Sequence, residues 1–292
     1  MNYAQLRAFH AVASEGSFTR AARVLRVSQP TVSSQVKALE TAYDVRLFDR
    51  QGRRVRPTEQ GAALFDITRR LFGLEVEAEE ALVGALSLER GQLKVGADSP
   101  PHAIPLLARF HARHPGIRLA LVTGNARDVA EALADYRVDV AVMAGEAPPP
   151  PLLALPFRDD PLVLIGGPRH PFARRGQVRL AELAGQDFVQ REPSSLTRQL
   201  LEAALRRAGV AVRTVLEVDG REALREAIAA GMGLGVTTRG ELGRDPRLKP
   251  IDIADATLSL TQRVVCLAER RRLGIVKAFL DVAREAAADL GR

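Results

Sequence analysis

Leucine, isoleucine and alanine recur at alternating steps of three and four residues between positions 64 and 88. This spacing keeps the apolar side chains on one stripe of an α-helix, and a repeat of 3.5 residues is typical of the seam of a coiled coil. Pro57-Thr58 precedes the pattern, so we expect one helix from there to about residue 89, roughly 45 Å long at 1.5 Å per residue. The seam consists of Leu64, Ile67, Leu71, Leu74, Ala78, Ala81, Ala85 and Leu88.

The stripe of this helix needs a partner that runs along its whole length. No other domain in the sequence is evident that could pack against it in this way. A second copy of the chain is the natural partner, and residues 59–90 are therefore predicted to form a linker and dimerisation helix. The alternative is a long helix that is buried against the body of its own chain.

The composition is that of an ordinary soluble protein. The 292 residues suit two domains, and 46% of them are hydrophobic and 26% charged. No apolar run approaches about 18 residues, so no membrane is expected as a partner. The N-terminus lacks the apolar core of a secretory signal. The single cysteine, Cys266, rules out an intramolecular disulfide and fits a reducing cytoplasm, which is the expected location.

The net charge of +7 is concentrated at one end of the chain. Residues 1–58 contain ten Lys or Arg and four Asp or Glu, which gives +6, whereas the remainder contains 32 and 31, which gives +1. Such asymmetry predicts a polyanion as the partner of the first segment. The alternative is a basic face that only increases solubility.

The basic segment carries the pattern of a helix-turn-helix. Residues 2–14 have apolar side chains at helical spacing, and Ser17 is a good N-cap for a second helix. Ser28 begins a third helix, in whose first turn Pro30 is tolerated. Only Arg26-Val27 separates the second and third helices, which favours two helices joined by a tight turn.

A small basic hairpin is predicted next to this motif, over residues 45–58. Two short apolar-containing runs flank Gln51-Gly52, and arginines lie at the tip, so the hairpin would be a wing. The third helix is apolar on one side and carries short hydrogen-bonding side chains on the other, which suits base edges in a major groove. We expect base contacts from Gln29, Pro30, Thr31, Ser33, Ser34 and Lys37, and phosphate contacts from Arg20, Arg23, Arg53, Arg54 and Arg56. The alternative is a plain solvated helix face.

Strand-like and helical runs alternate after Arg90-Gly91. Apolar runs such as 93–97, 117–122 and 138–144 are separated by helical patterns such as 103–113 and 126–136. Alternation of this kind predicts an α/β body, rich in parallel strands and with helices on both faces of the sheet.

The sequence of the first segment resembles a known family. The stretches LRAFHAVASEGSFTRAARVLRVSQPTVSSQVKALE and LFDRQGRRVRPTEQG are similar to the N-terminal winged helix-turn-helix of LysR-type transcriptional regulators, and the similarity continues over the whole chain. The resemblance carries the base-reading positions over to Gln29, Pro30, Thr31, Ser33 and Ser34, with Arg53 as the wing contact. In a dimer, each recognition helix reads one half-site, so the symmetry predicts an interrupted palindrome in double-stranded DNA as the target. Many members have Arg at the position of Ser34, so the operator is expected to differ.

The same resemblance implies the domain plan and the assembly. Residues 1–58 would be the DNA-binding domain and 59–90 the linker helix. Residues 91–292 would resemble a type II periplasmic binding protein, with lobe one at about 91–163 and 268–292, lobe two at about 164–267, and an effector between them. Linker helices would pair the DNA-binding heads, giving a homodimer or a homotetramer built as a dimer of dimers. RNA polymerase is a further possible partner of such a regulator.

Polar residues at the ends of the predicted strands are candidates for effector binding. Hydroxyl groups, backbone N–H groups and arginine at strand-to-helix junctions suit a small anion. The candidates are Ser99, Thr123, Gly124, Asn125, Ser194, Ser195, Thr197, Arg198, Thr237 and Thr238. Ordinary N-capping is the alternative role for each. The stretches GADSPPHAIPLLARF, GNARDV, REPSSLTR and DGREALREA resemble LysR-type regulators associated with aminoethylphosphonate catabolism, which implies a phosphonate or another small anion.

The patterns of catalytic or cofactor-binding proteins are weak in this sequence. The glycine-rich stretch 231–235 lacks the Lys-Ser/Thr of a phosphate-binding loop and joins a helix to a strand. His111 and His114 lack an evident third ligand, and Cys266 lies in an apolar strand, so no cofactor, metal or catalytic residue is expected. The alternatives to a regulator are an α/β enzyme, which these weak motifs disfavour, and a solute-binding transport protein. The basic first segment and the lack of a secretory signal argue against the transport protein.

Overall fold

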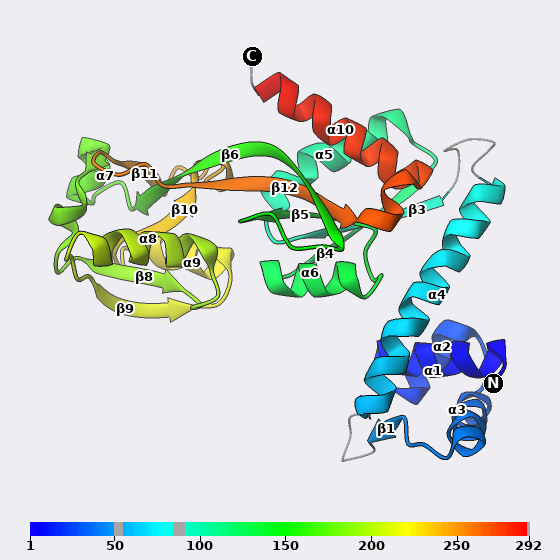
Figure 1. Cartoon of the computed structure of the whole chain (residues 1–292). Coiled ribbons are helices and arrows are strands. Elements are labelled where there is room, and N and C mark those ends of the chain that lie inside the picture. Colours follow the sequence, from blue (N-terminus) through cyan, green and yellow to red (C-terminus); the bar gives the residue numbers. More distant parts are fainter. Residues whose placement is uncertain (50–54, 84–90, 291–292) are drawn as a thin grey trace. The chain divides into compact units, whose positions relative to one another are not determined.

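Three short helices open the first of the two units into which the chain divides, Met1–Leu86 and Ser87–Arg292. The computed structural model describes residues 1–49, 55–83 and 91–290 (Figure 1). A side chain caps each of the three helices by accepting a hydrogen bond from an amide in the first turn, as Ser17 and Ser28 were expected to do. The helices are α1 (Tyr3–Glu15), α2 (Phe18–Leu25) and α3 (Gln29–Tyr43).

The three helices share one small core. Phe9 of α1, Ala21 of α2 and Val36 of α3 are all fully buried. Ala21 and Ala22 have short side chains, which let the neighbouring helices approach α2 closely. Arg26 ends α2 in the left-handed conformation, with φ 56°, so that the chain turns directly into α3. This arrangement is the predicted helix-turn-helix.

Two short strands follow α3 and form the base of the predicted wing. Strands β1 (Phe48–Asp49) and β2 (Arg56–Pro57) pair in antiparallel register, with Phe48 opposite Pro57. The tip of the hairpin, which includes Arg53 and Arg54, lies outside the described residues.

The linker helix, α4 (Glu59–Val83), begins against this hairpin. A Cβ atom at Gly61 would lie 2.0 Å from the carbonyl oxygen of Leu47, so glycine permits the close approach. Leu64 packs against the core of the first unit, whereas the Ile67, Leu71 and Leu74 side chains are 53%, 41% and 55% exposed. Ala78 is exposed as well, and the side chains of Ala81, Ala85 and Leu88 lie outside the described residues.

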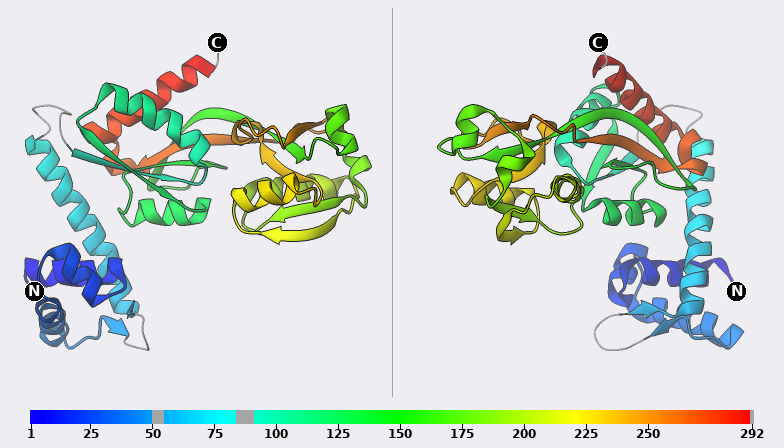
Figure 2. Two further views of the ribbon diagram at one scale, coloured as in Figure 1. Left: turned by 180° about the vertical axis from the view of Figure 1, so that it is seen from behind. Right: turned by 60° about the vertical axis from the view of Figure 1, so that its left-hand side comes forward.

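The second unit contains a sheet whose first part has the order β4-β3-β5-β12-β6 (Figures 1 and 2). Strand β3 is parallel to β4 and β5, and β12 is antiparallel to β5 and β6. Helices α5 and α10 share one core with this sheet, and α6 packs in another core. The strands are β3 (Gly91–Ala97), β4 (Ile117–Thr123), β5 (Val140–Ala144), β6 (Leu152–Gly166) and β12 (Ser259–Leu267); the helices are α5 (Pro100–Arg113), α6 (Ala126–Ala134), α10 (Gly274–Leu290) and the short η3 (Ala268–Arg272).

The far half of β6 belongs to a second group of strands. It pairs with β10 and β11, while β8 and β9 pair with each other and Leu234, just before β10, bridges to Phe188 of β8. Helices α8 and α9 pack in separate cores of this group. Its elements are α7 (Pro171–Arg175), β7 (Gln177–Val178), η1 (Leu180–Leu183), β8 (Asp187–Arg191), α8 (Leu196–Arg207), β9 (Arg213–Val218), α9 (Arg221–Ala229), β10 (Gly235–Thr238), η2 (Arg239–Glu241) and β11 (Lys249–Ile253).

The second unit therefore has two lobes, as predicted, and β6 and β12 run through both (Figure 1). The arrangement differs from the expected boundary at residues 267 and 268. Because β12 pairs with β5 over residues 262–265 and Cys266 lies in the core of lobe one, the end of β12 belongs to lobe one and not to lobe two. In the described part of the chain, no helix is both long and apolar enough to span a membrane.

Candidate functional site

The outer side of α3 carries the residues predicted to read bases. Gln29, Pro30, Thr31, Ser34 and Lys37 are exposed there, while Ser33 is half-buried. They are exposed because the opposite face of the helix, with Val32, Val36 and Leu39, is buried in the core.

Two of these hydroxyl groups also make local hydrogen bonds. The Thr31 hydroxyl lies 2.7 Å from the Ser28 hydroxyl, and the Ser34 hydroxyl donates to the Thr31 carbonyl oxygen at 2.9 Å. Both oxygens keep free lone pairs and can still accept from DNA. The helix begins with a cap and a free positive end, which favours a phosphate nearby.

Three of the cations expected to contact phosphates lie in the described residues. Arg20 and Arg23 are exposed on α2, and Arg56 is exposed on β2. Arg20 donates to the carbonyl oxygen of Glu15 and lies 3.7 Å from its carboxylate, so its guanidinium is positioned by the end of α1.

A narrow cavity of about 30 Å³ lies between the two lobes of the second unit. An open space of about 840 Å³ adjoins it, and Asp98, Asn125, Arg191, Glu192 and Arg221 line both. Lobe one contributes the ends of β3 and β5 and the start of α6, and lobe two contributes the starts of α8 and α9 and the end of β10. The residues that line the narrow part are Asp98, Asn125, Ala126, Ala144, Arg191, Glu192, Ser194, Ser195, Leu196, Thr197, Arg221, Thr238, Glu241, Leu260 and Gln262.

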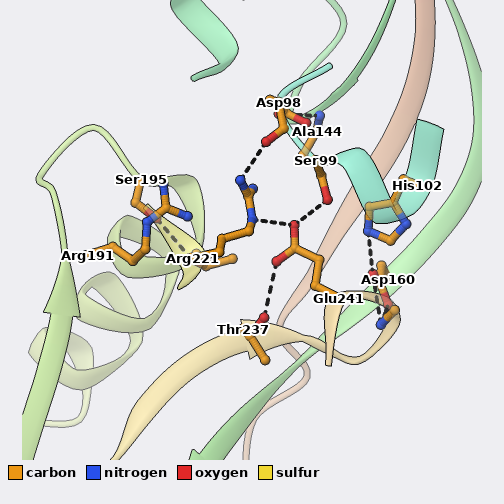
Figure 3. Close-up of polar contacts among 12 residues, drawn as sticks. Asp98, Ser99, His102, Ala144, Asp160, Arg191, Ser195, Arg221, Thr237 and Glu241 are labelled. Atoms are coloured by element: carbon orange, nitrogen blue, oxygen red, sulfur yellow. Dashed lines mark hydrogen bonds and ion pairs between the residues drawn. The ribbon is translucent and has the colours of Figure 1, made fainter. Parts of the chain in front are cut away.

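The carboxylate of Glu241 joins the lobes in this cavity (Figure 3). It accepts from the Ser99 hydroxyl of lobe one at 2.6 Å, from the Thr237 hydroxyl at 3.1 Å and from the Arg221 Nε at 2.8 Å. Arg221 in turn donates from Nη1 to the backbone carbonyl oxygen of Asp98 in lobe one at 2.5 Å. Ser99 and Arg221 thus form a polar connection across the cavity.

Asp98 itself is buried beside this connection. Its Oδ2 accepts from the Ala144 amide at 2.9 Å. Burial raises the pKa of Asp98 to about 6, with Glu241 adding to the effect, although the Ala144 amide and Arg221 act in the opposite direction.

Two helices point their positive ends at the cavity. The N-cap residues of α8 and α9, Ser195 and Gly220, make no side-chain cap bond, and the Ser195 hydroxyl pairs with the Thr197 hydroxyl at 3.0 Å. Arg191, at the end of β8, donates from Nε to the neighbouring Glu192 carboxylate at 2.8 Å. Backbone amides at helix starts together with arginine are suited to an anion.

The structure brings most of the predicted effector residues to this region. Asn125, Ser194, Ser195, Thr197 and Thr238 line the cavity, and Thr123 and Gly124 line its continuation towards solvent. Ser99 and Thr237 contribute through their bonds to Glu241.

Arg198 does not line the cavity. Its guanidinium is held by the Glu202 and Glu217 carboxylates at 2.8 Å and 2.7 Å. Four further residues that line the cavity were not predicted from the sequence, namely Asp98, Arg191, Arg221 and Glu241. Two of them could have been found from their positions in the sequence. Asp98 comes directly after a buried strand, and Arg221 follows Gly220 at a helix start.

Neither metal binding nor thiol chemistry gains support. Among the described residues, no group of three or more His, Cys, Asp or Glu side chains could hold a metal ion. Cys266 is buried, and burial raises the pKa of its thiol, which keeps it protonated.

Comparison with known proteins covers both units. Residues 3–62 match the family of bacterial regulatory helix-turn-helix proteins of the lysR family, and residues 87–288 match the LysR substrate binding domain. The chain is 37% identical to the RuBisCO operon transcriptional regulator of Allochromatium vinosum, over 80% of this chain and 78% of that protein. It is 34% identical to the HTH-type transcriptional regulator CfxR of Cupriavidus necator, over 89% of this chain and 83% of that protein.

Solved structures agree with this fold. A full-length OxyR variant from Pseudomonas aeruginosa has a TM-score of 0.80 at 22% identity, covering 97% of this chain and 95% of that chain. The CcmR regulatory domain of Synechocystis PCC6803, in complex with 2-PG, has a TM-score of 0.63 at 28% identity, covering 69% of this chain and 99% of that chain.

These relatives decide between the classes of function that the sequence left open. They are transcriptional regulators and not enzymes or solute-binding transport proteins. They include RuBisCO-operon regulators. The expected similarity of this chain to regulators of aminoethylphosphonate catabolism is therefore not supported. With helix-turn-helix and effector domain both matched, the chain belongs to the LysR family of DNA-binding transcriptional regulators.

Proposed function

We propose that this regulator responds to a small organic anion, such as a carboxylate, phosphate or phosphonate, bound in the cavity between its lobes. The observation that carries the proposal is the position of Arg221. Its guanidinium lies in the cavity, at the start of α9, and the start of α8, which lacks a side-chain cap, opens into the same space. An anion there would meet a cation and two positive helix ends.

The Synechocystis CcmR regulatory domain supports this choice of ligand, because it was solved with 2-PG and shares 28% of its sequence with this chain. The lining residues of this chain also offer hydroxyl groups, from Ser194, Thr197 and Thr238. Hydroxyl and guanidinium groups together suit a tetrahedral or planar anion.

The anion would act by competing with Glu241 for Arg221. In the structure, Glu241 accepts from Ser99 in one lobe and from Arg221 in the other. An anion that draws Arg221 away weakens this connection and favours a different arrangement of the lobes. Coupling to DNA requires that the anion bind the two arrangements with different affinity.

On the DNA side, the outer face of α3 reads bases and the surrounding arginines contact phosphates. The exposed seam of α4, with Ile67, Leu71 and Leu74, joins two chains so that their heads read an interrupted palindrome in double-stranded DNA. We infer a homodimer or homotetramer that works in the cytoplasm and contacts RNA polymerase at its promoters.

Thermal shift and calorimetric titration of the full-length protein test the effector proposal. Inorganic phosphate, acetate, 2-aminoethylphosphonate and 2-PG serve as probes. At least one should bind, and Arg221→Gln should weaken that binding by about tenfold or more, which corresponds to about 1.4 kcal/mol. Arg206→Gln, on an exposed position of α8, is the matched control. Unchanged affinity in Arg221→Gln, or no binding of any probe, would refute the proposal.

A further inference from the structure

One oxygen of Asp98 has no hydrogen-bond partner in the described structure. The residue is only 6% exposed, and its Oδ1 atom is buried without a donor. All its other polar atoms are used: the amide donates to Val142, the carbonyl oxygen accepts from Arg221, and Oδ2 accepts from Ala144. Buried carboxylate oxygens are normally paired, so this exception asks for a donor that the described residues do not supply.

Either protonation of the carboxylate or a donor group on a ligand could satisfy Oδ1. Burial raises the pKa of Asp98 to about 6, so the carboxyl is mostly ionised at neutral pH and the unpaired oxygen carries charge. The charged or titratable groups that act on it are Arg221 of α9, Glu241 of η2 and His102 of α5. Arg221 already donates to Glu241 and to the Asp98 backbone, and gives Oδ1 no hydrogen bond.

The outer space that Asp98 also lines carries further negative charge. Asp219 and Glu222 line it together with Asp98, and both are exposed. Neither forms an ion pair with another described residue, whereas Arg191 at the same place is paired with Glu192. Two exposed carboxylates that line the same space as a third, buried one without a donor favour a cation, and an ammonium group supplies both the charge and the hydrogen bond.

We propose that Asp98 determines effector specificity by accepting a hydrogen bond from an ammonium group, so that the effector is a zwitterion with an amine close to its acidic group. The inference rests on the proposed function, since the acidic group is assigned to Arg221 and the starts of α8 and α9. Asp98 and Arg221 lie on opposite lobes, so one zwitterion would contact both lobes at once (Figure 3).

The variant Asp98→Asn tests this role with little change in shape. The Ala144 amide needs an acceptor, so the side-chain oxygen of the asparagine takes the place of Oδ2. Its NH₂ group then occupies the place of Oδ1, and an acceptor becomes a donor. An ammonium group is repelled there, while an acid without an amine is not.

Matched ligand pairs provide the readout. Acetate and glycine, propionate and alanine, and ethylphosphonate and 2-aminoethylphosphonate are titrated into the full-length protein by calorimetry at about pH 7.5 and about pH 5, on either side of the pKa of Asp98. In at least one pair the amine-bearing member should bind about tenfold tighter at the higher pH. The preference should shrink at the lower pH, where Asp98 is protonated, and disappear in Asp98→Asn. The control Asp281→Asn, on α10 and outside the cavity lining, should change it less than about threefold.

The outcomes separate this inference from the proposed function. Binding of acids that depends on Arg221 but shows no preference for the amine in any pair overturns the zwitterion and leaves the anion site standing. A preference that survives in Asp98→Asn, or that does not change with pH, overturns the role of Asp98. If no probe of either kind binds, the proposed function fails as well. Thermal melting of Asp98→Asn verifies that the variant is folded, and the pH series of the parent tests the proposal without any substitution.

Discussion

The carboxylate of Asp160 lies 3.0 Å from the imidazole Nε2 of His102, and both side chains are almost completely buried. Asp160 belongs to β6, where that strand passes between the lobes, and His102 belongs to α5 of lobe one. The amide of Gly240, next to Glu241, donates to the same carboxylate at 2.9 Å. Asp160 therefore ties a helix of lobe one to the turn that carries Glu241 into the cavity between the lobes.

Asp160→Asn is expected to destabilise the effector domain by about 1.5–3 kcal/mol, since His102 and the Gly240 amide lose a buried, charged acceptor. Burial alone raises the pKa of Asp160, but the neighbouring His102 ring, together with the Thr238 side chain and the Gly240 amide, outweighs it and keeps the pKa below its usual value. Calorimetric unfolding of the full-length protein measures the change. Arg158→Gln is the control, because its guanidinium is 3.8 Å away and partly exposed. Equal stability of Asp160→Asn and the parent would contradict this role.

Gly240→Ala is expected to disturb the same contact from the other side. A Cβ atom at Gly240 would lie 2.6 Å from Asp160 Oδ2 and 2.6 Å from His102 Cε1, which is too close for any side chain. The turn and Glu241 must shift, so effector affinity should change together with stability. Gly176→Ala is a useful comparison, since its added Cβ meets no described atom within 4 Å and only its φ of 77° is unfavourable. Unaltered effector binding in Gly240→Ala would show that the turn is not coupled to the cavity.

Much of this fold was predictable from local signals. Ser17 and Ser28 identify the helix starts, and buried strands such as 93–97 are visible as apolar runs. The first half of β6 was not predicted, because Pro156, Asp159 and Asp160 interrupt the strand pattern, and their positions make sense only once β12 pairs with β6. Pairing between residues about 100 positions apart leaves no mark within a short window of sequence.

The candidate site was only partly predictable, because local signals identify some of its residues and long-range contacts bring the others to it. Hydroxyl groups at strand ends follow a general rule of α/β folds, and the structure places Ser195 and Thr238 at the cavity as expected. Glu241 lies in a short turn after β10, and its meeting with Ser99 of lobe one depends on the closure of two lobes. Contacts between charged residues of different lobes can be recognised only in the tertiary structure.

Stability of the first unit should fall as the pH drops from about 6.5 to about 4 because of His10. Its ring packs on Phe65 and Phe72 of α4 and lies 3.1 Å from the Thr68 hydroxyl. Burial, aided by Arg69, lowers the pKa of His10 to about 4, whereas in the unfolded chain it stays near 6.5. The unfolded state therefore binds the proton first, and stability is lost as the pH falls. Melting temperatures of the parent should decline more over this pH range than those of His10→Gln. The same pH dependence in both proteins would argue against this role of His10.

Ser33→Ala should weaken discrimination between operator and unrelated DNA by about 1 kcal/mol, the lower end of the range for a base contact. Arg53→Ala should instead weaken binding to every duplex and lower the dependence on salt, because a phosphate contact releases counterions. Fluorescence anisotropy with DNA from upstream of the protein's own gene and with a scrambled duplex measures both. If the two variants bind operator like the parent, the assigned contacts are wrong.

Leu71→Asp should break the pairing of the linker helices. Ile67, Leu71 and Leu74 expose 53%, 41% and 55% of their surface on one stripe of α4, a pattern that is unfavourable unless a second surface covers it. Burying a leucine stabilises by about 1.5–3 kcal/mol, and an aspartate would lose this and face its own copy across a twofold seam. Light scattering should show a lower oligomer for Leu71→Asp. Ala62→Asp adds the same charge at an exposed position away from the seam and should assemble like the parent. An unchanged mass for Leu71→Asp would mean that the stripe is covered by something other than a second α4, and operator affinity should then be unaffected too.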